Sequence, residues 1–391
     1  MRRAGRVCFG LVAGVVSAAP ATAADEPAVS WSGWTASPSP LDESRLDSLE
    51  RAALARCGPG EAGLREAARA SASRKLQGLP TGDLDAVEFA QRASGEPHPW
   101  PRVWLATAIG LDAGAALRKL DAWLATESDA LRRCGVAAMS RADGTRVLAV
   151  VTVDALADLA PLPTRARPGQ WLLLEARLQV AARGVRVFVA GPDGAPRTVP
   201  VALEGSELRA RFAPDRPGEH VVQVVADLAS GPRPVLEASV FADAEPPQAE
   251  ASRSAPGQGA APGDAANDAD ALARMLATAR ASAGLSPLAR DASLDAVARA
   301  HARRMADRHA LAHDCGDGSP LDRVRAAGLE PRVAAENVAH AATVALAHRA
   351  QWWSPSHRAN MLGPAADHVG VAVARDERGD AWVVELFADL R

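Results

Sequence analysis

The spacing of apolar residues predicts a first domain over residues 41–159. Leu46 and Leu49 begin a pattern with the period of a helix, and a similar pattern follows over residues 62–72. The stretch closes on a β-rich run, residues 146–153, directly after an Asp-Gly turn. Helices followed by strands indicate an α+β domain.

Residues 160–243 change to short runs in which apolar and polar residues alternate. Turn signals separate these runs, among them Gly-Pro-Asp-Gly at 191–194 and Asp-Arg-Pro-Gly at 215–218. Strands at this spacing predict an all-β sandwich with an immunoglobulin-like layout. Residues 244–268 are rich in Pro, Ser, Ala and Gly, a composition that predicts a mobile linker unable to bury a core.

Residues 269–391 predict a second α+β domain. Asp268 is the expected N-cap of its first helix, which should end at Gly284. A second helix is expected from about Ser293. The remaining expected elements are a short helix over residues 343–353 and two antiparallel strands over residues 369–374 and 381–387.

The first domain resembles a degenerate copy of the last. Residues 62–72 match 292–302, residues 92–95 match 325–328, and residues 134–137 match 369–372, with nearly constant offsets of 230, 233 and 235. An Ala- and Arg-rich chain gives chance matches, but the shared order and spacing favour a duplication. In the first copy Ser71 replaces His301, and nothing replaces His313, Glu336 or His357.

The first 24 residues read as a secretory signal peptide. Arg2, Arg3 and Arg6 precede a short apolar run, and small residues at 21–24 offer a cleavage site. We therefore expect a secreted or extracytoplasmic protein, in the periplasm, on the cell surface or outside the cell, with no transmembrane segment after cleavage. The net charge of -3 gives no sign of nucleic-acid binding.

Export permits disulfide bonds. Three cysteines follow the signal peptide, namely Cys57, Cys134 and Cys315. Cys57 and Cys134 lie in the same predicted domain and are the expected pair. The alternative is three buried thiols.

Three short segments near the C-terminus carry the candidate chemistry: Ala312-His313, Ala335-Glu336-Asn337, and residues 354–360, which include His357. Two imidazoles and a carboxylate suit Zn²⁺ or another divalent metal, with His313 and His357 as ligands. Histidine also transfers protons near neutral pH. The alternative is a set of core histidines that bind Glu336 and brace the loops.

These segments resemble the CAP superfamily of cysteine-rich secretory, antigen 5 and pathogenesis-related proteins, in its bacterial SCP-like secreted branch. Further matches lie at residues 319–323, 326–328 and 369–371, so the resemblance covers about a third of the chain. It implies an α-β-α sandwich with a cleft lined by two histidines and two acids. His313, Glu336 and His357 match cleft positions, and Asn337, Arg358 and Asn360 are expected to support them.

The chain departs from the family pattern at two points. Ala335 stands where glycine is usual, and the second acid falls near Ser354 or Pro355, neither of which is acidic. Two further candidates are weaker. His301 and His309 share a helix face expected to pack, and Glu385 is expected to be a solvated or paired strand residue.

The expected architecture is therefore multidomain: a degenerate CAP-like α+β domain, an immunoglobulin-like sandwich, a linker and an intact CAP domain. We expect binding of an extracytoplasmic ligand, such as a lipid, a wall fragment or a protein, with or without a divalent metal. The first alternative is a metal-assisted hydrolase of peptides or wall polymers, with Glu336 polarising water. No nucleophile is evident, since Ser356 lacks a G-x-S-x-G setting. The second alternative is a non-catalytic surface adhesin.

Overall fold

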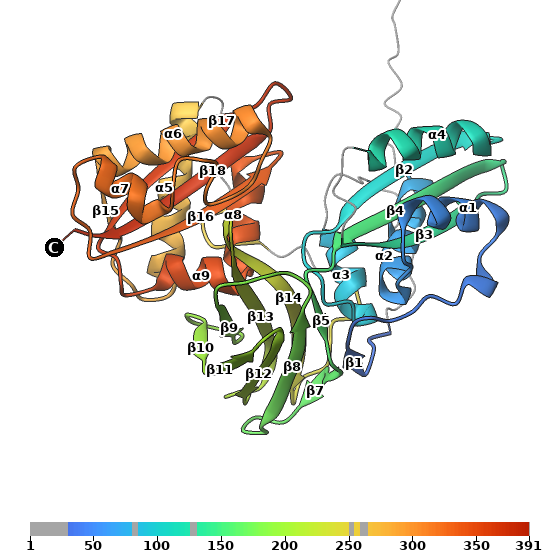
Figure 1. Cartoon of the computed structure of the whole chain (residues 1–391), viewed down its shortest axis with the longest axis horizontal. Coiled ribbons are helices and arrows are strands. Elements are labelled where there is room, and N and C mark those ends of the chain that lie inside the picture. Colours follow the sequence, from blue (N-terminus) through green and yellow to red (C-terminus); the bar gives the residue numbers. More distant parts are fainter. Residues whose placement is uncertain (1–29, 80–84, 126–130, 250–253, 259–264, 391) are drawn as a thin grey trace, which may run out of the picture.

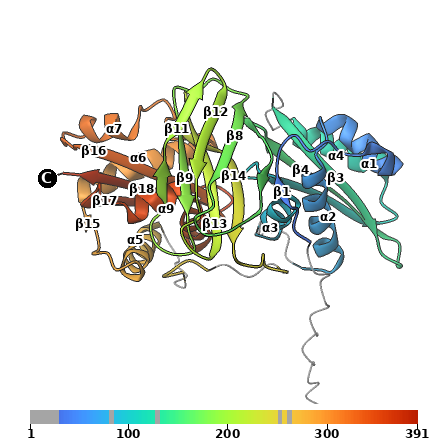
Figure 2. The same cartoon turned by 90° about the horizontal axis from the view of Figure 1, so that it is seen from below.

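The computed structural model describes residues 30–79, 85–125, 131–249, 254–258 and 265–390. The predicted signal peptide lies outside these residues. Two mixed α/β parts flank a central all-β part (Figure 1), and the view from below shows the β part between them (Figure 2). No helix among the described residues is long and apolar enough to span a membrane.

The N-terminal part is a three-stranded sheet with helices on both faces. The sheet has the order β2-β4-β3. Leu148 and Val150 of the central strand pack toward α1 and α4, whereas Val147, Ala149 and Val151 pack toward α2 and α3. The elements are η1 (Glu43–Arg45), α1 (Ser48–Cys57), α2 (Ala62–Leu76), α3 (Asp85–Ser94), β2 (Arg102–Ile109), α4 (Ala113–Leu124), β3 (Arg132–Ser140) and β4 (Thr145–Asp154).

Cys57 and Cys134 form a disulfide that joins the end of α1 to β3, so of the two alternatives left open by the sequence, this pair holds and the three free thiols do not. The bond closes a sequence separation of 77 residues. Cys315 is a free, buried cysteine.

The central part is built from two sheets around one shared core. Alternating burial along β12 shows how each strand contributes one face to that core: Leu208, Ala210 and Phe212 are buried, and the residues between them are exposed. The immunoglobulin-like layout stays a prediction. One sheet has the order β10-β9-β13-β14-β7 and the other β11-β12-β8-β5, while β1 pairs with β6. The strands are β1 (Trp34–Thr35), β5 (Ala157–Leu159), β6 (Leu162–Pro163), β7 (Arg165–Ala166), β8 (Leu172–Leu178), β9 (Val185–Ala190), β10 (Arg197–Val199), β11 (Val201–Glu204), β12 (Glu207–Phe212), β13 (Gly218–Leu228) and β14 (Gly231–Ala242).

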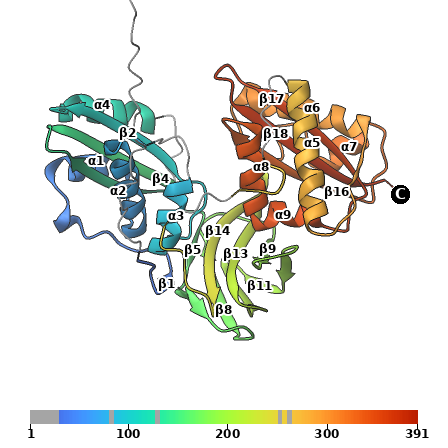
Figure 3. The same ribbon diagram turned by 180° about the vertical axis from the view of Figure 1, so that it is seen from behind.

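The C-terminal part repeats the layered plan with the sheet order β15-β17-β18-β16. Val383 and Phe387 of β18 pack beneath α5 and α8, and Val384 and Leu386 pack beneath α6. Figure 3 shows α5 lying across this sheet. The elements are α5 (Ala265–Ser282), β15 (Ala289–Arg290), α6 (Ala292–Arg308), α7 (Pro320–Ala326), β16 (Val333–Ala341), α8 (Val344–Trp353), α9 (Pro355–Leu362), β17 (His368–Arg375) and β18 (Ala381–Asp389).

The predicted start of this part is wrong in two respects. Helix α5 begins at Ala265, so Asp268 lies inside the helix, where it is buried and paired with Arg375 at 2.6 Å. The linker was predicted to build no core, yet Ala255 is packed in the core beneath α5. The carbonyl of Pro256 also accepts a hydrogen bond from His348 Nε2 at 3.0 Å. Residues 250–253 and 259–264 of the predicted linker lie outside the described residues.

The N-terminal and C-terminal parts share an order of elements and a close helix–strand contact. Both sheets place the strands of the last hairpin and the preceding strand in the same order, β3-β4-β2 and β17-β18-β16. A Cβ added to Gly135 would lie 2.0 Å from the carbonyl carbon of Leu64, and one added to Gly370 would lie 2.2 Å from that of Leu294. The two pairs occupy matching positions of the repeat in the sequence.

Candidate functional site

Strand β16 distributes the candidate residues over both faces of the C-terminal sheet. Its successive side chains point in opposite directions: Val338 packs beneath α6 and Ala339 beneath α5. Glu336 therefore faces α6, and Asn337 faces α8 and α9. Because β16 is an edge strand, groups from the two faces can meet around it.

Glu336 is the centre of the first polar cluster, in which both of its oxygens are engaged. Oε2 lies 2.9 Å from His313 Nδ1 and 3.7 Å from His301 Nε2, and Oε1 is paired with Arg323. Glu336 is only 5% exposed, and this burial raises the pKa of its carboxyl group. The hydrogen bond from His313 and the charge of Arg323 outweigh burial, so the pKa is lowered and the carboxylate stays ionised.

The sequence did not assign three residues of this cluster to the site, namely His301, Asp317 and Arg323. His301 was expected to be a packing residue, but its Nδ1 lies 2.9 Å from Asp317 Oδ2 and its Nε2 lies 3.0 Å from the carbonyl oxygen of Ala312. Arg323 also donates to the carbonyl of His313 at 2.7 Å. Arg323 lies inside a segment that carries the family resemblance, which is the one signal that pointed to it.

The second cluster lies on the opposite face and is organised by Asn337. Its amide Nδ2 donates to Glu385 Oε2 at 3.0 Å and to the carbonyl of His357 at 3.1 Å. Asn360 donates to Asn337 Oδ1 at 2.9 Å, and its role in supporting a cleft stays a prediction. Arg358 instead places its guanidinium over the Trp352 ring, 4.4 Å from the centroid.

Two buried polar atoms of the second cluster, His357 Nδ1 and Glu385 Oε1, have no hydrogen-bond partner among the described residues. Burial lowers the pKa of His357 to about 3, with a smaller contribution from the charge of His313, so the ring is neutral. Burial raises the pKa of Glu385 to about 7. Glu385 is fully buried and accepts a hydrogen bond from Asn337, so of the two alternatives expected from the sequence it is the paired strand residue and not the solvated one.

The structure brings His313 and Glu336 together and leaves His357 across the edge strand, where it still senses the charge of His313. Within the described part of the chain, the group of three ligand atoms close enough for one metal ion belongs to His340, Asp376 and Asp380. Arg323 and His313 already satisfy Glu336, so a cation bound there would have to displace them. A metal at His313 and His357 stays a prediction.

The central β part lies directly against this site. The amide of Asp314, next to His313, donates to the carbonyl of Ser230 at 3.2 Å. A Cβ added to Gly231 would lie 2.7 Å from His313 Cβ. Gln223 of β13 accepts from the amide of Ser356 at 2.9 Å. The β13–β14 hairpin and the face of β13 therefore cover the loop that carries His313 and the first turn of α9, which carries His357.

The fold and these segments define the class of the C-terminal part. Residues 273–387 match the model of the cysteine-rich secretory protein family, CAP, so this part of the chain is a CAP domain, as its resemblance predicted. Over 106 residues the chain is 32% identical to the uncharacterized protein YkwD of Bacillus subtilis (strain 168). That match covers 27% of this chain and 40% of the relative, so the chain spans less than half of the relative's length.

Two solved structures are similar at low identity. An outer surface protein from Borrelia burgdorferi is 21% identical, with 32% of this chain and 93% of that chain covered and a TM-score of 0.31. An extracellular protein containing an SCP domain from Bacillus anthracis is 14% identical, with 60% and 86% covered and a TM-score of 0.30.

The raised pKa of Glu385 predicts a pH-dependent stability. The folded state binds the proton of the Glu385 carboxyl group more tightly than the unfolded chain does. The stabilisation that this protonation gives is therefore complete below pH 4.5 and is lost as the pH rises through about 7. Glu385→Gln keeps an acceptor for Asn337 without the titration. Between pH 5 and 8 the wild type should lose stability relative to this variant, by about 3 kcal/mol.

Urea unfolding of both proteins at each pH measures that difference. His357 has a lowered pKa and contributes in the opposite direction, losing stability as the pH falls below 6.5, but this contribution is common to both proteins. A difference that stays constant with pH would show that Glu385 titrates normally.

Proposed function

We propose that the protein binds a ligand outside the cytoplasm at the edge of β16, through His313, Glu336 and His357. The observation that carries this proposal is the pair of unsatisfied buried atoms, His357 Nδ1 and Glu385 Oε1, on residues joined by one asparagine amide. Buried polar atoms in folded proteins nearly always have a partner. A ligand with both a hydrogen-bond donor and an acceptor would supply the missing ones.

Binding is favoured over hydrolysis by the state of Glu336. A general base that polarises water needs a free oxygen, and both oxygens of Glu336 are engaged by His313 and Arg323. Its lowered pKa also makes it a weak base. Membership of the C-terminal part in a family of secretory proteins supports a role outside the cytoplasm, with a lipid, a wall fragment or a protein as the ligand. The immunoglobulin-like central part would serve as a second wall of the site.

The test is a ligand screen read directly at His357. The full mature protein, labelled with ¹⁵N at histidine, is titrated with soluble wall muropeptides, palmitate and cholesterol, and the ring nitrogen shifts are followed by NMR. A ligand at the site should shift the His357 resonances and should no longer bind His357→Phe. The matched control is His348→Phe, because His348 is also buried with an unpartnered Nδ1 but lies against Pro256. The proposal would be contradicted if His357→Phe and His348→Phe lost ligand binding equally, or if no probe shifted the His357 resonances.

Metal binding is tested separately by elemental mass spectrometry of the untagged mature protein after zinc reloading. Zinc that is lost in His313→Ala/His357→Ala but kept in His340→Ala would establish the predicted metal pair. Zinc lost in His340→Ala alone would assign the metal to the cluster with Asp376 and Asp380. No zinc in the wild type would leave a metal-free binding site.

A further inference from the structure

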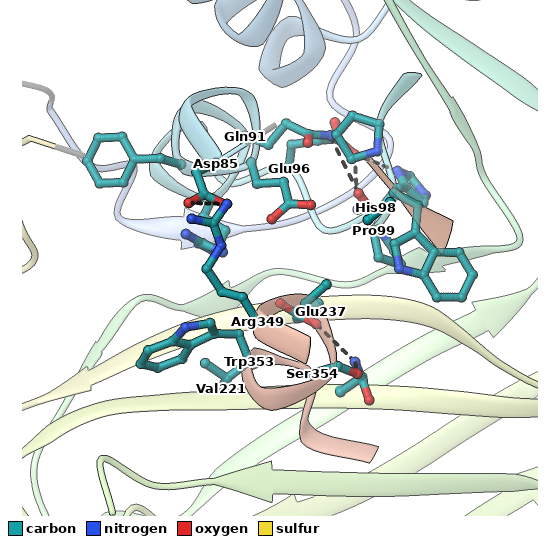
Figure 4. Close-up of a pocket in the computed structure, with 18 of the residues that line it drawn as sticks. Asp85, Gln91, Glu96, His98, Pro99, Val221, Glu237, Arg349, Trp353 and Ser354 are labelled. Atoms are coloured by element: carbon teal, nitrogen blue, oxygen red, sulfur yellow. Dashed lines mark hydrogen bonds and ion pairs between the residues drawn. The ribbon is translucent and has the colours of Figure 1, made fainter. Parts of the chain in front are cut away.

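A cavity of about 280 Å³ lies where the three folded parts meet, away from the His313–Glu336 cluster. Its walls are α3 with the segment after it, strands β13 and β14, the end of β16, and helix α8 (Figure 4). None of the residues proposed for the CAP-domain site lines it. The cavity is thus a separate candidate site that only the assembled chain contains.

Contacts from all three parts fix the walls of this cavity. The amide of Glu237 in β14 donates to the carbonyl of Pro97 at 2.8 Å. Gln223 of β13 donates to Glu237 Oε2 at 3.0 Å and to Ser354 Oγ at 3.1 Å. Arg349 of α8 is paired with Asp85 of α3 at 3.0 Å. The cavity is therefore preformed, which lowers the conformational cost of binding.

Glu96 is the buried acid of the cavity. Its side chain is inaccessible to solvent, and Oε1 lies 2.5 Å from Nδ1 of His98, whose Nε2 faces the carbonyl oxygen of Ala157 at 2.9 Å. Burial opposes a charge on His98, but the Glu96 carboxylate outweighs it and the pKa of His98 is raised. The second oxygen of Glu96, Oε2, has no hydrogen-bond partner among the described residues. In Figure 4 the Glu96 carboxylate is directed toward the space above Arg349 and Glu237.

Acidic and basic groups both line the cavity. The acids are Asp85, Glu88, Glu96 and Glu237, and the basic groups are Arg92, Arg349, His98 and His340. Glu96 is paired with His98 and Asp85 with Arg349. The pKa of Glu88 is raised to about 7, first by burial and then by repulsion from Glu237 and Asp85, while Arg92 and Arg349 oppose the rise. A bound cation would relieve this repulsion and favour the ionised form of Glu88.

We propose that this cavity binds a small organic cation that carries a primary ammonium group, of the size of a lysine side chain or a short diamine. An ammonium group donates three hydrogen bonds and would satisfy Glu96 Oε2. Trp353 and Trp100 also line the cavity and supply aromatic surface for the alkyl chain, with the guanidinium group of Arg233 over the Trp100 ring, 5.4 Å from its centroid. The volume matches such a ligand, at the small end of ligand pockets.

A bare metal ion is a poorer match for the same walls. The carboxylates of the cavity do not form a group of three ligand atoms close enough for one ion. The group of that kind among the described residues is His340 with Asp376 and Asp380, and of these three only His340 lines the cavity. Carboxylates spread over a cavity of this volume suit an elongated cation that contacts them at different points.

The test is isothermal titration calorimetry of the full mature protein with 1,5-diaminopentane, beside glutarate as the dianion of similar length. The diamine should bind and glutarate should not. Glu96→Gln and Glu237→Gln should each weaken diamine binding about tenfold or more, because each removes a charged partner of the ammonium group. Glu330→Gln removes an exposed carboxylate that does not line the cavity and should leave binding unchanged.

Binding should also strengthen between pH 6 and 8, since the cation favours the ionised form of Glu88 and a proton is released on binding. Circular dichroism verifies that each variant is folded; if Glu96→Gln is not, Glu237→Gln decides. The proposal is wrong if the wild type does not bind the diamine, if glutarate or calcium binds equally well, or if the folded cavity variants bind like Glu330→Gln.

Discussion

Gly370→Ala should destabilise the CAP domain by about 3 kcal/mol or more, since overpacking against rigid atoms usually costs 1–3 kcal/mol. The added Cβ would lie 2.2 Å from the carbonyl carbon of Leu294 and 2.5 Å from its carbonyl oxygen. These are backbone atoms of α6, so no side-chain rotation can relieve the overlap. The helix would have to move away from β17, and Val371 would lose the hydrogen bond between its amide and Asp295.

Gly135→Ala should have the same effect in the N-terminal part, where the Cβ would lie 2.0 Å from the carbonyl carbon of Leu64. Hydrogen exchange with mass spectrometry measures each effect in its own part of the chain. The control is Gly114→Ala in α4, whose Cβ would be 3.4 Å from the nearest atom and which should stabilise by about 0.5 kcal/mol. If Gly135→Ala and Gly370→Ala each lost less than 1 kcal/mol of stability, the helices would lie farther from their strands than the structure shows.

Replacing both Cys57 and Cys134 by serine should destabilise the N-terminal part by about 4 kcal/mol, the value that loop-closure entropy gives for a long loop. The disulfide closes a separation of 77 residues, and both cysteines are fully buried between α1 and β3. The serine hydroxyls would also need partners in an apolar core. Reduction of this disulfide in the wild type should cause a similar loss of stability, which thermal unfolding with and without reductant measures.

Cys315→Ser is the matched control for that experiment. It replaces a buried cysteine of the CAP domain that forms no disulfide. This variant keeps the Cys57–Cys134 bond, so it should respond to reductant as the wild type does and leave the stability of the oxidised N-terminal part unchanged. If the double serine variant unfolded at the same temperature as the oxidised wild type, the disulfide would contribute nothing to stability.

The sequence predicted most helices and the last hairpin, since their apolar periodicity is strong. It missed β16, because the run from Val333 to Ala341 is rich in alanine and carries Glu336 and Asn337 at its centre. It also missed α9, where Ser354, Pro355 and Ser356 resemble a turn although proline is favoured at the first position of a helix.

The sequence predicted only part of the site, because short motifs do not give the position of a residue in the sheet. Short motifs place His313, Glu336 and His357 in a common region, but they do not show which face of a strand each residue occupies. The ring of His301 reaches Glu336 over 35 positions of sequence, and Asn337 reaches Glu385 over 48 positions. Contacts of this length arise from the sheet register and from helix packing, and no local pattern encodes them.

The position of the β13–β14 hairpin has a kinetic consequence. Ser230 and Gly231 lie against the loop of His313, so a neighbouring domain would border the ligand site proposed for the CAP domain. The association rate of a ligand would then depend on how often the two domains separate, and not on diffusion alone. A covalent tether between the hairpin and that loop would slow both entry and release, while the equilibrium affinity changed much less.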